Sequence, residues 1–131
     1  MKLDFASDYY SNNSSIEVFE FLDKTITYAE YFTQGLPLYA LDDTSNIEGW
    51  SGASIIHAGS GTKTITAGNG NNLIYTEAAN TTTTTAGSGN NTIILGSGNN
   101  VVKTLYGKDT IVSGTGNDHL EGGIGSDTYI F

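Results

Sequence analysis

The sequence has no cysteine and few basic residues, and each of these features excludes certain classes of function. Without cysteine the chain can form no disulfide scaffold, no thiolate zinc site and no thiol nucleophile. Five lysine and arginine residues stand against fourteen aspartate and glutamate residues, which gives a formal net charge of −9. Nucleic acid is excluded as a partner, because no basic patch exists to neutralise phosphates.

Long apolar runs are also missing. No run approaches the ~20 residues that a helix needs to cross a bilayer, so we expect no membrane span. The first eight residues lack the apolar region of a Sec signal peptide. A location outside the cell would therefore require another export route.

Composition changes sharply near Trp50. Residues 1–50 hold ten of the fourteen aromatic residues, whereas residues 51–131 hold fifteen of the seventeen glycines. We therefore predict an aromatic-rich capping segment at residues 1–49 and a repetitive body at residues 50–131. Within the capping segment, apolar and β-branched runs at residues 16–22 and 26–32 favour strands over helix.

A nine-residue period runs through the repetitive body. Each unit has two glycines separated by one residue, then an Asn or Asp two positions later, then an aliphatic residue two positions further on. The clearest units are residues 67–75, 86–94, 95–103, 113–121 and 122–130. About nine units are visible, and the degenerate unit at residues 77–85 breaks the count by one residue.

This pattern resembles the RTX (repeat-in-toxin) nonapeptide, G-G-x-G-x-D-x-U-x, in which U is a large aliphatic residue. The resemblance covers roughly residues 50–131 and is strongest from Gly107 to Phe131. It implies an all-β fold, a right-handed parallel β-roll with a small β-rich N-terminal cap, and Ca²⁺ as the cofactor. The glycines permit tight turns and the x-U-x triplets favour short strands, so two units complete one coil of eighteen residues.

The eighteen-residue coil predicts two sheets with a narrow core between them. The side chains expected to point inward are Ile56, Ile74, Ile93, Ile111 and Tyr129 on one sheet, and Ile65, Thr84, Val102 and Leu120 on the other. The outward side of the first sheet is apolar and needs a partner. We expect its interface residues to be Leu73, Tyr75, Ile94, Val112 and Ile130. Either the capping segment or another chain covers them.

In the RTX family, calcium lies between the loops of stacked coils, bound by the repeat aspartates and by carbonyls of the glycine turns. The ligands that the resemblance implies are Asp109, Asp118, Asp127, Asn91, Asn100, Gly107, Gly114, Gly116, Gly123 and Gly125. Upstream units carry Ser54, Lys63, Asn72 and Thr82 at the aspartate position. Neutral asparagines bind Ca²⁺ weakly and a lysine repels it, since ligand charge sets affinity.

We therefore expect few calcium ions, all toward the C-terminal end, with side-chain ladders of Asn72 and Asn91 holding the earlier coils. The alternative, in which the aspartates only close turns and bind no metal, stays open. His57 and His119 fall on different sheets, so they form no zinc pair. No nucleophile-elbow pattern is present either, and we predict no enzyme active site.

These features favour an extracellular, non-catalytic calcium-binding module, exported by a type I-like route. The C-terminal secretion signal of a complete RTX protein is not visible, so a module of a longer protein and a different export route both remain open. A second hypothesis is a self-assembling structural or adhesive fibre subunit, a homo-oligomer that stacks its roll ends or its apolar Thr/Ile face. Ice or surface binding through the outward threonines and service as an accessory domain of an enzyme are further alternatives.

Overall fold

The computed structural model describes residues 18–20, 25–27, 37–39, 46–76 and 79–131. The chain divides into two compact units, residues 1–36 and residues 37–131. In the first unit, β1 (Val18–Glu20) pairs antiparallel with β2 (Thr25–Thr27). The expectation of strands over helix is confirmed for these residues, and the rest of the runs at 16–22 and 26–32 lies outside the described residues.

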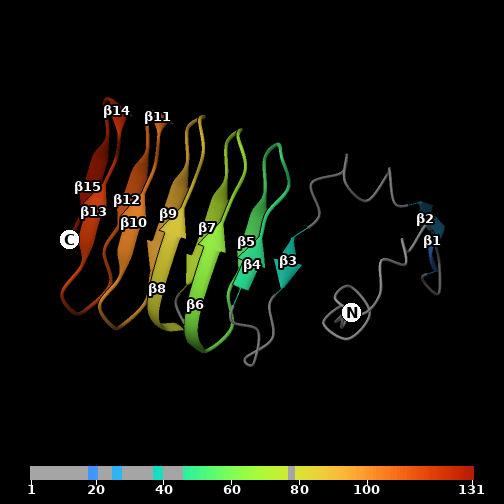
Figure 1. The fold of residues 1–131 in the computed structure, drawn as a ribbon, viewed down its shortest axis with the longest axis horizontal. Helices are drawn as coiled ribbons and strands as arrows, with labels where there is room; N and C mark the ends of the chain where they lie inside the picture. The colour runs from blue at the N-terminus through green and yellow to red at the C-terminus, as the bar shows by residue number, and fades with distance from the viewer. Residues whose placement is uncertain (1–17, 21–24, 28–36, 40–45, 77–78) are drawn as a thin grey trace. The chain divides into compact units, whose positions relative to one another are not determined.

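The second unit consists of two parallel sheets wound from one chain (Figure 1). The six-stranded sheet contains β3 (Leu38–Tyr39), β5 (Ile55–His57), β7 (Leu73–Thr76), β9 (Thr92–Leu95), β12 (Thr110–Val112) and β15 (Thr128–Ile130). The five-stranded sheet contains β4 (Asn46–Glu48), β6 (Gly61–Thr66), β8 (Ala79–Thr85), β10 (Val101–Lys103) and β13 (His119–Glu121). A short parallel pair joins β11 (Tyr106–Gly107) to β14 (Ile124–Gly125).

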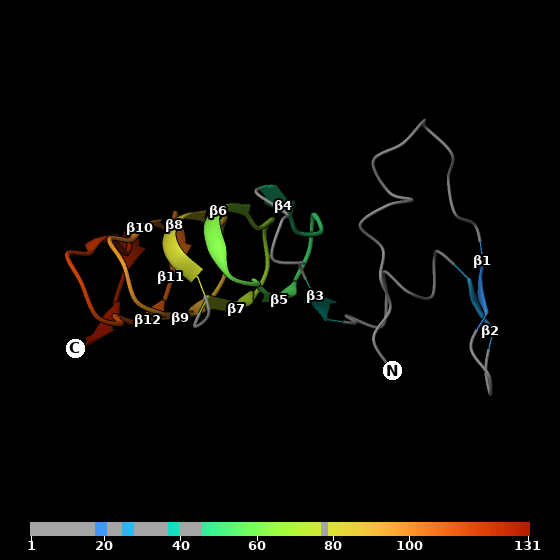
Figure 2. The same cartoon turned by 90° about the horizontal axis from the view of Figure 1, so that it is seen from below.

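Figure 2 shows the two large sheets as opposite walls of the roll, connected by turns on either side. From β3 onward, and apart from the short strands β11 and β14, successive strands alternate between the two walls, and each strand pairs with the strand one coil away. Thr110 therefore lies beside Thr92 and Thr128, eighteen residues away on either side. The predicted all-β parallel β-roll with two nonapeptides per coil is confirmed.

The roll begins earlier in the chain than residue 50, where we expected it to start. Leu38 of β3 pairs with Ile56, and Ile47 of β4 pairs with Ile65, so both strands extend the two large sheets. The boundary falls instead between Leu36 and Pro37. This coil is difficult to recognise in the sequence because the coil lacks paired glycines, although its apolar residues keep the eighteen-residue spacing.

The core is a narrow stack of aliphatic side chains between the walls. Fully buried residues at the predicted inward positions are Ile56, Ile74, Ile93 and Ile111 on one sheet, and Ile65, Thr84 and Val102 on the other. Leu120 is only partly buried and Tyr129 is 39% exposed. Both belong to the last described coil, in β13 and β15.

The predicted one-residue break in the repeat appears as a bulge between β6 and β8. Gly61 lies beside Ala79, but the next residue, Thr62, lies beside Thr81, so one residue of β8 is extra. A bulge keeps later strands in phase because the inserted residue leaves the ladder locally and pairing then resumes. Ile65 consequently still lies beside Thr84 in the core.

Two buried threonines provide a matched test of the interior. The hydroxyl of Thr84 is buried with no hydrogen-bond partner, whereas that of Thr82 donates to Oδ1 of Asn100 at 2.8 Å. We expect Thr84→Val to raise the free energy of unfolding by about 1 kcal/mol, because an unsatisfied buried hydroxyl is removed. Thr82→Val should lower it by about 1 kcal/mol, because a satisfied hydrogen bond is lost. Urea unfolding of both variants measures the difference, and shifts in the same direction would contradict this account of the core.

Candidate metal centre

Two columns of side chains run along the roll at the position two residues before each inward aliphatic residue. We call them the first and second Asx columns. The first contains Ser54, Asn72, Asn91, Asp109 and Asp127, and follows the six-stranded sheet. The second contains Lys63, Thr82, Asn100 and Asp118, and follows the five-stranded sheet. The columns hold the three aspartates that the sequence analysis singled out.

In the first Asx column, Oδ1 of every Asn and Asp accepts the backbone N–H of the column residue one coil earlier. Oδ1 of Asn72 accepts from Ser54 at 2.9 Å, and Oδ1 of Asn91 accepts from Asn72 at 3.1 Å. Oδ1 of Asp109 accepts from Asn91 at 2.7 Å, and Oδ1 of Asp127 accepts from Asp109 at 3.0 Å. The predicted ladder of Asn72 and Asn91 is confirmed, and the same contact continues through Asp109 to Asp127.

The asparagines also close their own turns through the amide nitrogen. Nδ2 of Asn72 donates to the carbonyl oxygens of Gly68 at 2.9 Å and Gly70 at 3.0 Å. Nδ2 of Asn91 donates in the same way to Gly89 at 2.9 Å. An ionised carboxylate has no N–H to give, so an aspartate in this position leaves its turn carbonyls without that donor.

Asp109 has one side-chain oxygen that is buried without a hydrogen-bond partner. Its side chain is 1% exposed, and Oδ1 accepts from both the backbone N–H and Nδ2 of Asn91. The other oxygen, Oδ2, is buried without any hydrogen-bond partner. A buried carboxylate is unfavourable unless it is paired or ligates a metal. Carboxylate and backbone carbonyl oxygens are the ligands of Ca²⁺, so the residues around Asp109 fit a calcium ion.

Asp118, in the second Asx column, has both oxygens satisfied. Oδ1 accepts from the backbone N–H and Nδ2 of Asn100 at 2.9 and 2.8 Å, and Oδ2 accepts from the hydroxyl of Ser113 at 2.6 Å. Burial raises the pKa of Asp118, but the hydrogen bonds from Ser113 and Asn100 together hold it below the ordinary value of 3.8. Asp118 is therefore anionic at neutral pH.

The predicted glycine ligands lie in the turns that flank these aspartates. Gly107, Gly116 and Gly123 have positive φ angles of 143°, 128° and 71°, which favour glycine. A Cβ atom at Gly114 or Gly125 would collide with a carbonyl oxygen of the coil beneath, that of Gly96 or Gly107. The geometry thus explains why glycine stands at these positions. Their role as carbonyl ligands stays a prediction, as do the ligand roles of Asn91, Asn100 and the three aspartates.

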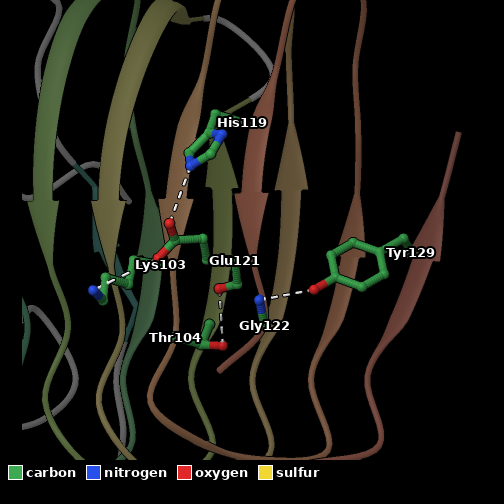
Figure 3. A network of polar contacts seen from close by, with 6 residues as sticks. All are labelled: Lys103, Thr104, His119, Glu121, Gly122 and Tyr129. Carbon is green, nitrogen blue, oxygen red and sulfur yellow. Dashed lines mark hydrogen bonds and ion pairs between the residues drawn. The ribbon is translucent and has the colours of Figure 1, made fainter. Parts of the chain in front are cut away.

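Glu121, the remaining carboxylate of the last coils, lies outside the columns on the five-stranded sheet (Figure 3). Its oxygens contact Nε2 of His119 at 3.1 Å and Nζ of Lys103 at 3.6 Å. The hydrogen bond from His119 and the charge of Lys103 lower the pKa of Glu121. Within the described ranges, no three His, Cys, Asp or Glu side chains gather at one point. A calcium ion beside Asp109 would therefore take most of its ligands from backbone carbonyls.

The predicted interface residues Tyr75, Ile94, Val112 and Ile130 lie in one register row of the six-stranded sheet, whereas Leu73 lies in the row of Thr92. Leu73, Tyr75, Ile94 and Val112 are half-buried and Ile130 is exposed; their role as an interface stays a prediction. We missed the extension of this row toward the N-terminus. The rings of Tyr39, His57 and Tyr75 stack with centroids 4.7 Å apart. The eighteen-residue spacing of these three residues could have revealed the stack.

The fold and the two Asx columns define a β-roll of nonapeptide repeats. The profile of the RTX calcium-binding nonapeptide repeat matches the chain in four copies, at residues 39–74, 49–82, 85–104 and 104–130. The chain therefore belongs to the RTX family, whose repeats bind Ca²⁺ and whose β-roll is a structural motif rather than a catalytic fold. No curated protein and no solved structure gave a significant match. In the part of the chain that the structure describes, no helix is long and apolar enough to traverse a membrane.

The lowered pKa of Asp118 predicts an acid-sensitive contribution to stability in metal-free protein. A carboxyl whose pKa is lower in the folded state stabilises the fold above its unfolded pKa, and this contribution disappears as the pH falls through the folded pKa. Ser113→Ala should bring the pKa of Asp118 back toward 3.8, because the hydroxyl that lowers it is lost. Carbon-detected NMR titration in the presence of a chelator measures this pKa, with Ser97→Ala as the control. An unchanged pKa in Ser113→Ala would contradict the assignment.

Proposed function

We propose that the chain is an extracellular, non-catalytic β-roll module whose C-terminal coils are stabilised by calcium. The observation that carries this proposal is the buried, unpartnered Oδ2 of Asp109. In the earlier turns, by contrast, the amide nitrogen of an asparagine donates to the glycine carbonyls of its own turn. The same column thus changes from neutral amides to carboxylates within one coil step. Calcium is the cation proposed because the available ligands are all oxygen atoms.

The coils before Asn91 are proposed to fold without metal. Their turn carbonyls already accept from asparagine amides, so a cation would have to displace a hydrogen bond to bind. Lys63 adds a further obstacle in the second Asx column, where its side chain is 1% exposed. A lysine ammonium in the column repels a divalent cation.

The proposed location outside the cell follows from the coupling of metal binding to folding. Proteins with RTX repeats are typically secreted. A ligand that binds only the folded state stabilises it in proportion to its concentration. C-terminal coils that need calcium would remain loose where calcium is scarce and close after type I-like export into a calcium-rich medium.

Calcium titration with residue-resolved hydrogen exchange tests the proposed function. Calcium at about a hundred times its dissociation constant should add about 2.7 kcal/mol to the stability of the coils that bind it. We expect slower exchange for amides of residues 105–130 and no change for residues 54–76. Uniform protection along the roll, or none at millimolar calcium, would contradict the division between the two halves.

Exchanging the two side-chain types in the first Asx column gives a sharper test. Asp109→Asn should stabilise the metal-free protein by about 1–3 kcal/mol, because an unpartnered carboxylate oxygen is replaced by a donor for the turn. It should also weaken calcium binding at this coil. The matched variant Asn91→Asp should destabilise the metal-free protein and increase its response to calcium. Isothermal titration calorimetry and urea unfolding measure both effects, and an undiminished calcium response in Asp109→Asn would overturn the site.

Self-assembly is the second candidate function. The apolar row of Tyr75, Ile94, Val112 and Ile130 lies along the six-stranded sheet, and Ile130 is 47% exposed. A second copy that packed against this row would bury it. Sedimentation velocity across a calcium series separates the candidates, because a folding module stays monomeric while it gains β-structure and a fibre subunit gains mass.

A further inference from the structure

Asn69 and Gly70 form the only Asn-Gly pair in the sequence. They lie in the turn between β6 and β7, and Asn69 is exposed. Asn-Gly is the dipeptide most prone to deamidation, because glycine has no Cβ to hinder attack by its backbone nitrogen. The proposed metal chemistry does not use this pair, which lies in the coils closed by asparagine ladders.

The reaction needs no partner other than water. The backbone nitrogen of Gly70 attacks Cγ of Asn69, a new C–N bond forms, and the side-chain nitrogen leaves as ammonia. The resulting cyclic imide is then opened by water at one of its two carbonyls. One opening gives aspartate and the other gives isoaspartate, in which the chain continues through the side-chain carbon.

In the closed roll, both reacting groups are hydrogen-bonded to the same neighbour, Ser88. The N–H of Gly70 donates to the carbonyl oxygen of Ser88 at 2.6 Å. Oδ1 of Asn69 accepts from the N–H of Ser88 at 3.0 Å. The backbone N–H of Asn69 also donates to Ser51 at 3.0 Å, so the turn is fixed by coils on both sides. Attack requires the backbone nitrogen of Gly70 to lose its proton and the side chain of Asn69 to rotate. Each of these changes breaks one hydrogen bond to Ser88.

We propose that Asn69 is a modification site that the fold controls, protected while the turn at Ser88 is stacked on it and reactive once that turn separates. Local opening of this kind has its own free energy, which is smaller than that of global unfolding. The extent of deamidation at Asn69 therefore increases with the fraction of time that the two turns are separated. The proposal does not depend on calcium binding.

The two products have different consequences for the roll. Aspartate keeps a side-chain oxygen that can accept from Ser88, so the turn can close again. Isoaspartate adds a methylene group to the backbone between two stacked turns. Gly70 has a φ of 103°, and even a Cβ there would lie 2.7 Å from the backbone nitrogen of Ala53. The turn is packed this closely against the neighbouring coil, so we expect the lengthened backbone of the isoaspartate form not to close on Ser88.

Deamidation rates in folded and unfolded protein test the proposal. The full chain is incubated at neutral pH with calcium, with and without urea, and modification at each asparagine is followed by peptide mass spectrometry. We expect deamidation of Asn69 to be about a hundredfold slower in the folded protein, because only the open fraction reacts. Asn71, Asn90 and Asn99 are followed by asparagine and serve as internal controls that should change little in either state. Equal rates at Asn69 in both states would overturn the proposed protection.

Two variants and one separated product test the remaining steps. Asn69→Gln should show no modification at this position in urea, which assigns the signal. Asn69→Asp should have nearly the wild-type stability, because its carboxylate still accepts from Ser88. The isoaspartate form, purified from the urea incubation, should refold with lost protection around Ser88 in hydrogen exchange. Wild-type protection in that form would overturn the proposed block.

Discussion

The hydrogen bond from a backbone N–H to the side-chain oxygen one coil later is the constraint on which the roll depends. In the first Asx column it links Ser54 to Asn72, Asn72 to Asn91, Asn91 to Asp109 and Asp109 to Asp127. A short strand of three residues offers few ladder bonds, and a single unit cannot bury its own aliphatic side chain. The side-chain bond satisfies a buried N–H at each turn and fixes the coil step, which is eighteen residues, or nineteen where the inserted residue falls, and this step aligns Ile74, Ile93 and Ile111 in the core.

The residue at the same position also decides which group provides the hydrogen-bond partners of each turn. Asparagine offers both an acceptor to the preceding coil and a donor to its own turn, so it is self-sufficient. Aspartate offers acceptors only, and the structure then supplies the missing partner to Asp118 through Ser113 but not to Oδ2 of Asp109. One sequence position therefore yields a metal-independent turn, a hydroxyl-bonded turn and a turn that fits a cation. This gradient along the roll is the basis of the proposed function.

Much of the fold could be predicted because a strict nine-residue period leaves few choices. The inward positions, the asparagine ladder and the break at residues 77–85 all follow from counting, since side chains alternate along a strand. The first coil escaped detection because Leu38 and Ile47 lack the glycines that mark the others. The burial of Lys63 could not be foreseen either, because lysine at a polar position normally points to solvent. The stack of Tyr39, His57 and Tyr75 was readable from spacing alone, but two of its residues lay near or before the expected boundary.

The period, the family, the column that each side chain enters and the change from asparagine to aspartate along that column can all be read from the order of the residues. These features are local or periodic, so they are visible in the linear sequence. Which carboxylate oxygens find hydrogen-bond partners, in contrast, depends on the folded coils. Asp109 and Asp118 occupy equivalent places in their repeats, yet Ser113 reaches Asp118 across a turn and the corresponding oxygen of Asp109 faces no donor. That distinction depends on the packing of neighbouring turns in three dimensions, which a repeat consensus does not encode.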